Sequence, residues 1–193
     1  MDFKIVGGAV TQLVSDPITT INAAVVGNPE LQAVSDEMIK FGEGHPDWLH
    51  RTCLKGHLTG SGFVVSPSTQ SVLLIHHRKL GRWLQPGGHA DGMSNLAEVA
   101  AKEVAEETGL VGLDLVWPAI DLDIHEIPER GEEPTHLHLD VRFLFVADGE
   151  VAPTGNHEVN DVEWVSIDDD RVRESDSFTA WSRAVKVAAN LER

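Results

Sequence analysis

The chain has 193 residues, of which 41% are hydrophobic and 24% charged, as in a globular protein that can bury a substantial core. Its formal net charge of −16 argues against non-specific binding to long nucleic acid, because such binding relies on clustered Lys and Arg. No apolar run approaches the roughly 20 residues of a membrane-spanning helix, and Met1 to Lys4 do not begin a secretory signal.

Residues 1–56 predict an N-terminal helical extension that packs on the main domain, and residues 57–193 form that domain. Apolar residues recur at helical spacing after Pro29, which suits a first turn: Leu31, Val34, Met38 and Phe41. Asp16-Pro17 and residues 42–44 read as breaks. Residues 45–51 predict a short ordered crossing into the main domain.

The pattern of short apolar runs and turns beyond residue 57 predicts a mixed α/β domain. Strands are expected over residues 59–65 and 71–76 as a hairpin, and then over 115–125, 135–147 and 162–166. Residues 81–92 are expected to be a long loop. Helices are expected over residues 95–108 and 178–191. This order indicates a central sheet with helices on both sides.

The helix over residues 95–108 carries the most informative pattern of the chain. Glu103, Glu106 and Glu107 are spaced i, i+3 and i+4, which places three carboxylates on one helical face. Like charges so placed repel one another unless a cation offsets them. Oxygen-only ligands select magnesium, manganese or calcium over zinc. The segment therefore indicates metal-assisted chemistry.

The segment from Gly88 to Leu110 also resembles the signature box of the Nudix hydrolase family. That box reads Gly, five residues, Glu, seven residues, then Arg-Glu-apolar-any-Glu-Glu-any-Gly-apolar. Every gap is intact here, and Ser94 and Lys102 stand where the family has Glu and Arg. The resemblance covers roughly residues 57 to 193. It implies an α/β/α sandwich with a central mixed sheet, preceded here by the helical extension.

The resemblance implies roles for individual residues. Glu103 and Glu107 would be the main ligands of Mg²⁺ or Mn²⁺, joined by the Gly88 carbonyl. Glu106 would be a third ligand or a base that positions water. Glu158 matches, by its position in a loop, an acidic residue that acts in many family members as an extra ligand or as general base. An exposed loop glutamate is the alternative for Glu158.

The strand over residues 135–147 has an unusual polar face. Alternation places four polar residues on one side and apolar residues on the other: His136, His138, Asp140 and Arg142. His125 on the preceding strand is a candidate to join this face. Three interpretations stay open: substrate recognition through Arg142, Asp140 and the histidines, a second metal site at His136 and His138, or a solvated sheet face.

A basic patch precedes the box. Arg78 and Arg82, with Lys79, are candidates to hold the non-reacting phosphates of a substrate. His89 either braces the loop or touches the substrate. Cys53 with His57 offers a thiol nucleophile only in an acyl-transfer context that the sequence lacks.

These features predict a divalent-metal-dependent hydrolase that cleaves a diphosphate linkage in a small nucleotide-type compound, by attack of water on phosphorus. One alternative is a catalytically weak nucleotide-binding module, suggested by Ser94 and Lys102. The other is an isoprenoid-diphosphate isomerase that uses a Cys and a Glu. Cys53 is the only cysteine, which excludes an intrachain disulfide and leads us to expect a cytoplasmic location. The extension either caps the site or mediates homodimerisation.

Overall fold

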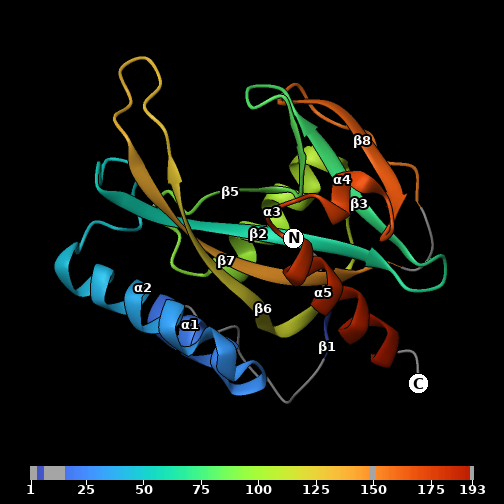
Figure 1. The fold of residues 1–193 in the computed structure, drawn as a ribbon, viewed down its shortest axis with the longest axis horizontal. Helices are drawn as coiled ribbons and strands as arrows, with labels where there is room; N and C mark the ends of the chain where they lie inside the picture. Colours follow the sequence, from blue (N-terminus) through green and yellow to red (C-terminus); the bar gives the residue numbers. More distant parts are fainter. Residues whose placement is uncertain (1–3, 7–15, 148–150, 192–193) are drawn as a thin grey trace.

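The computed structural model describes residues 4–6, 16–147 and 151–191, which form one eight-stranded sheet flanked by helices (Figure 1). The strands are β1 (Lys4–Val6), β2 (Gly56–Ser66), β3 (Ser71–His77), β4 (Arg82–Leu84), β5 (Gly87–His89), β6 (Asp114–Ile127), β7 (His136–Val146) and β8 (Val159–Ser166). The sheet order is β1-β6-β7-β2-β3-β4, with β5 paired to β2 and β8 paired to β3.

The sheet is mixed, as the sequence predicts. β2 and β7 run parallel, in register from Gly56 beside Leu137 to Val65 beside Val146. β6 and β7 run antiparallel, and so do β2 and β3, which form the expected hairpin. Because β2 lies between β7 and β3 and also pairs with β5, its side chains are central to both faces of the sheet.

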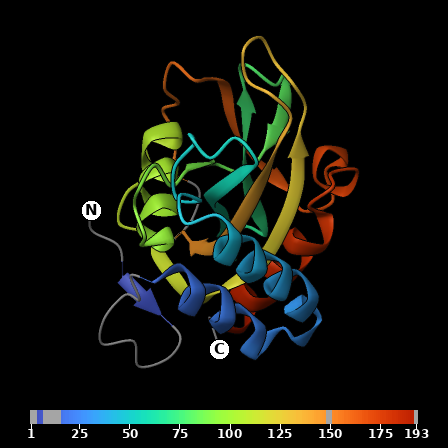
Figure 2. The same ribbon diagram turned by 90° about the vertical axis from the view of Figure 1, so that its left-hand side faces the viewer.

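Helix α3 (Leu96–Thr108) covers one face of the sheet (Figure 2). The side chain of Asn95 caps its first turn by accepting the N–H of Glu98, and Gly109 ends it in the left-handed conformation at φ 72°. Leu96, Ala100 and Val104 are fully buried and face the sheet. A Cβ on Gly62 of β2 would lie 2.4 Å from Val104 Cγ2, so a glycine there lets the helix approach the sheet.

Helices α4 (Asp170–Arg173) and α5 (Phe178–Leu191) lie on the other side of the sheet (Figure 2). Trp181 of α5 is 1% exposed, and its ring meets that of Phe63 with centroids 4.3 Å apart. Apolar side chains of β2, β3 and β7 complete this second core. The two cores confirm the predicted α/β/α sandwich.

The N-terminal region is helical, as predicted, and packs against β6. It contains α1 (Pro17–Gly27), the short 3-10 helix η1 (Pro29–Leu31) and α2 (Gln32–Gly44). The sequence predicts a break at Asp16-Pro17, and in the structure these residues start α1. The Asp16 carboxylate caps the helix by accepting the N–H of Thr19. Ile21 and Met38 are fully buried in the same core as β6 and β7. The domain boundary at residue 56 stays a prediction.

The loop expected over residues 81–92 contains two short strands, so that prediction was wrong in part. β4 pairs with β3, and β5 pairs with β2 through Thr59 beside His89 and Gly60 beside Gly88. A strand of three residues is too short to show alternation in the sequence. Such strands form because they pair with strands from elsewhere in the chain. Their pairing anchors the glycines of the box to the centre of the sheet.

Candidate active site

The three glutamates of α3 differ in their surroundings. Glu107 is 1% exposed, whereas half of the Glu106 side chain is exposed. The Oε2 atom of Glu107 accepts the N–H of Gly87 at 3.0 Å. This hydrogen bond ties β5 to the helix and orients the most buried carboxylate of the site.

The Glu103 carboxylate packs against the backbone at Gly88. A Cβ on Gly88 would lie 2.6 Å from Glu103 Cδ, a distance that real Cβ atoms do not adopt. The missing side chain therefore leaves room for the carboxylate beside the peptide. The carboxylates of Glu103 and Glu107 both lie against the backbone of Gly87 and Gly88, and carboxylate oxygens are ligands that a hard divalent cation prefers.

Lys102 contacts the carboxylates directly. Its Nζ lies 3.0 Å from Glu103 Oε1 and 3.2 Å from Glu106 Oε2. Burial lowers the pKa of Lys102, but its bonds to Glu103 and Glu106 outweigh this and raise the pKa overall. The lysine thus offsets part of the negative charge from the position where the family has Arg.

Ser94 and Asp91 lie near the position of the missing family glutamate. Ser94 lies just before the helix, but Asn95 is the residue that caps it. Asp91 forms a bidentate ion pair with Arg51 from the segment before β2. The charge of Asp91 is therefore already paired.

The pKa values of Glu103 and Glu107 are raised by their surroundings. Burial raises the pKa of Glu103, and burial raises the pKa of Glu107 to about 8. The charges of Glu106 and Glu158 also raise both values, while the Gly87 N–H opposes the rise at Glu107. Glu158 is therefore close enough for its charge to reach both carboxylates. A bound cation would relieve this accumulation of charge, so the residues present fit a divalent metal ion.

Without metal, the Glu107 carboxyl is expected to make the stability depend on pH. Its pKa of 4.5 in the unfolded chain rises to about 8 in the fold, so between these values only the folded chain holds the proton. Stability is therefore fully present below the unfolded pKa and falls as pH rises through the folded one. Over about pH 6.5 to 8 this carboxyl alone should lower the stability by roughly 1 kcal/mol per pH unit.

Urea unfolding from about pH 6.5 to 8 with a chelator present measures this loss. Glu107→Gln keeps an acceptor for the Gly87 N–H and cannot titrate, so its stability should stay nearly level over this range. Equal slopes in the wild type and in the variant would contradict the assignment.

The arginines of the basic patch lie near the box but have partners of their own. Arg78 donates its backbone N–H to the Glu158 carbonyl and its Nε–H to Asn160. Arg82 forms an exposed ion pair with Asp176 at 3.1 Å. Both arginines stay predictions as phosphate ligands, and Arg78 lies beside Glu158.

Asp140 and Arg142 lie in a buried network of ion pairs. Arg142 is 6% exposed and donates to the carboxylates of Asp140, Asp121 and Asp123 at 2.8 to 3.0 Å. Asp140 also accepts the hydroxyl protons of Thr59 and Ser61. A substrate role for the pair stays a prediction, since the contacts described are those of a brace between β2, β6 and β7.

Sequence reasoning missed several members of this network. Arg183 of α5 reaches Asp121 at 2.6 Å and Glu30 of the extension at 2.9 Å. Thr59 and Ser61 of β2 point to the same face. The alternation His57-x-Thr59-x-Ser61 could have shown a polar face on β2, matching that of β7.

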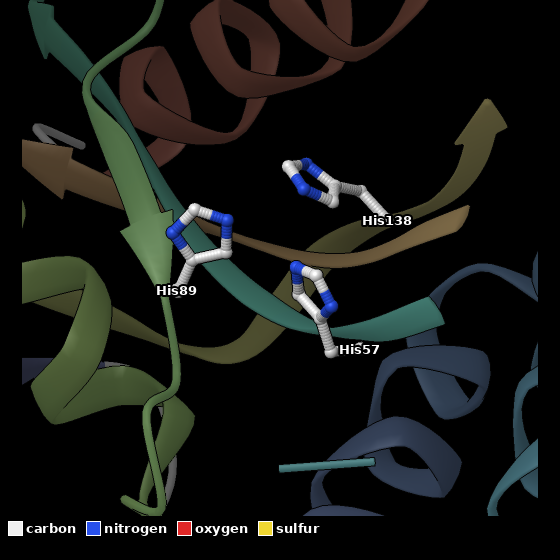
Figure 3. Close-up of side chains that lie close together, drawn as sticks. All are labelled: His57, His89 and His138. Atoms are coloured by element: carbon white, nitrogen blue, oxygen red, sulfur yellow. The ribbon is translucent and has the colours of Figure 1, made fainter. Parts of the chain in front are cut away.

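The predicted histidines gather around one that was missed. His89 and His138 both lie close to His57, whose ring is 4.9 Å from the His136 ring as well. His125 joins at the edge, 5.5 Å from His138. Figure 3 shows the three central rings, His57, His89 and His138, which come from β2, β5 and β7.

The fold and the carboxylate site together place the chain among hydrolases that act on acid anhydrides. A model of the NUDIX domain matches residues 56–183, and the chain belongs to the Nudix family.

Solved structures share this fold. The chain is similar to the E. coli dihydroneopterin triphosphate pyrophosphohydrolase at 15% identity and a TM-score of 0.57, over 69% of this chain and 95% of that one. It is similar to the NUDIX domain of Shewanella oneidensis NrtR complexed with ADP ribose at 20% identity and a TM-score of 0.50, over 67% and 86%. A Nudix family hydrolase from Clostridium perfringens matches at 19% identity and a TM-score of 0.50, over 71% and 98%.

Proposed function

We propose that the chain is a divalent-metal-dependent pyrophosphohydrolase that cleaves a diphosphate linkage in a small nucleotide-type compound. The observation that carries this proposal is the convergence of Glu103 and Glu107 on the backbone of Gly87 and Gly88, with Glu106 beside them. Membership of the Nudix family supports the same chemistry.

Each residue of the site has a proposed task. Glu103, Glu107 and the Gly88 carbonyl would hold Mg²⁺ or Mn²⁺, with Glu106 as a further ligand. The ion, when bound, stabilises the negative charge that develops on the phosphate oxygens. Glu158 is half-exposed and would act as general base, accepting a proton from the attacking water. Glu106, also half-exposed, is the alternative residue to position that water.

The substrate is proposed by class. Arg78 and Arg82 would contact its non-reacting phosphates. His89, His136 and His138 stay candidates from the sequence, although they lie on the face of the sheet opposite the glutamates. The printed names of the similar structures include a triphosphate pyrophosphohydrolase and an ADP-ribose complex. At 15 to 20% identity these similarities show the fold alone. The proposal of a nucleotide-type substrate therefore rests on the site and on membership of the family.

A catalytically weak nucleotide-binding module is the second candidate. Lys102 favours it, because the ammonium group already occupies two of the carboxylates that a cation would use. The isomerase alternative depends on Cys53, which is 4% exposed. Burial raises the pKa of that thiol, so its reactive thiolate form is disfavoured.

The location and assembly of the chain stay predictions. None of the helices described has both the length and the apolar character that a membrane crossing requires. A cytoplasmic location and a homodimer formed through the extension are proposed on the sequence alone. Helices α1 and α2 of the extension both lie against β6.

A phosphate-release screen tests the proposed function. Nucleoside triphosphates, nucleoside diphosphate derivatives and an isoprenoid diphosphate are incubated with Mg²⁺ or Mn²⁺, and phosphate is read after coupling enzymes have converted the products. Release from a nucleotide-type compound that stops with chelator is the expected result. Binding without release would favour the module, and a rearranged isoprenoid diphosphate without release would favour the isomerase.

A further inference from the structure

A group of metal-ligating side chains lies apart from the glutamates. His57 of β2, His89 of β5 and His138 of β7 each offer one ring nitrogen, and these three nitrogens lie within 4.8 Å of one another. The ring centroids are 4.9 to 5.0 Å apart, and Figure 3 shows the rings around a common space.

The register of the sheet places the three rings together on the face opposite the glutamates. His57 lies beside His138 in the parallel β2–β7 pair, and His89 lies beside Thr59, two residues along β2. Side chains alternate along a strand, so Gly88 adjoins Glu103 while the next residue, His89, points to the other face. Three paired strands form a rigid support for such a site.

Two of the nitrogens are buried without a partner. Over residues 16–147 and 151–191, three buried side-chain polar atoms have no hydrogen bond: Ser35 Oγ, His57 Nε2 and His138 Nε2. A buried polar atom left without a hydrogen-bond partner destabilises the fold. Two of the three atoms lie in this one cluster, where a bound ion would satisfy both.

The second nitrogen of His57 orients its ring as in known metal sites. His57 Nδ1 lies 3.5 Å from the Cys53 carbonyl. A carbonyl only accepts, so Nδ1 carries the proton and Nε2 has the free lone pair. His136 stacks on His57 and bonds a backbone carbonyl through its own Nδ1 at 2.8 Å. It flanks the three rings as a further imidazole.

We propose that His57, His89 and His138 bind a Zn²⁺ ion, with a fourth position left for water or a ligand. Zinc–nitrogen bonds of about 2.0–2.1 Å would hold the nitrogens about 3.3 Å apart, so the rings close by side-chain rotation. Imidazole nitrogens suit zinc, as they also suit copper, iron and nickel, whereas the carboxylates of α3 suit magnesium or manganese. The chain then carries two metal sites of different chemistry on opposite faces of the sheet.

The test is zinc binding by the full, untagged chain after dialysis against a chelator. Calorimetric titration with ZnCl₂ is expected to give one tight site per chain, and Co²⁺ in its place is expected to give the visible spectrum of a four-coordinate ion. The site should persist in the Glu103→Gln/Glu107→Gln double variant. His89→Gln and His138→Gln should each weaken binding at least about tenfold.

His157→Gln is the matched control, because the His157 side chain is 86% exposed in a loop and should not affect zinc binding. Circular dichroism checks the fold of each variant, and zinc should raise the Tm of the wild type but not of His89→Gln. His89 and His138 are both partly buried, and His89→Gln serves as the test if His138→Gln does not fold. Absence of zinc binding, or a site lost with the glutamates and kept without the histidines, would overturn the proposal.

Discussion

Glu107→Gln is expected to lower the rate of phosphate-anhydride hydrolysis at least about a hundredfold while the chain stays folded. Glu107 is the most buried carboxylate of the site, and its removal deletes a negative charge that the proposed cation needs. Gln has nearly the same shape and still accepts the Gly87 N–H, so β5 and α3 stay joined. The measurement is kcat on the substrate found by the screen, with circular dichroism as the check of folding.

Glu98→Gln is the matched control for this variant. Glu98 lies on the same helix, in its first turn, and its side chain is exposed away from the other three carboxylates. This control should keep wild-type kcat. If Glu107→Gln retained full activity, or if both variants lost it equally, the carboxylates would not be the catalytic site.

Arg142→Met is expected to cause the largest loss of stability, about 3–5 kcal/mol, because it leaves buried carboxylates without their cation. The Arg142 guanidinium donates to three aspartates, and its burial in the wild type is possible because these charges surround it. Burial lowers the pKa of Arg142, but Asp140 and Asp123 outweigh this effect and raise it. Methionine fills a similar length but offers no donor. Urea unfolding at neutral pH measures the change in free energy.

Arg82→Met is the control for the loss of an arginine. Its ion pair with Asp176 is exposed on both sides, so its removal should cost at most about 1 kcal/mol. If Arg142→Met does not fold, Asp123→Asn removes one partner at a half-exposed position and should cost less. Equal stabilities of Arg142→Met and Arg82→Met would contradict the network as a brace.

The two proposed metal sites meet at strand β5. Gly88 adjoins Glu103 on one side of the sheet, and His89 joins His57 on the other. β5 has only three residues and depends on its pairing with β2. The position of β5 beside β2 therefore supports both proposed sites.

The helix of the box was predictable because its signals are local. Asn95 and Gly109 cap it, and the spacing of Glu103, Glu106 and Glu107 defines one face without reference to the rest of the chain. The helix over residues 178–191 was predicted with its observed ends for the same reason. The long strands were also found: β2, β3, β6 and β8 extend beyond the predicted ends, whereas β7 is one residue shorter than predicted at each end.

The partners of the polar residues were not predictable in this way. Arg142 and the histidines were seen as one polar face, but only the pairing of β2 with β7 brings His57 to His138, and only β6 supplies Asp121. These contacts join residues about 20 to 80 positions apart.

The amino-acid sequence by itself determined the family, the carboxylate helix and the layered fold, because capping, periodicity and motif spacing are properties of neighbouring residues. The tertiary structure decided the rest. In the structure, Arg142 lies in a buried network of ion pairs, and Lys102 bonds a carboxylate that a cation would use. Three histidines from three strands lie together. Strand register sets those contacts, and register depends on pairing between distant segments.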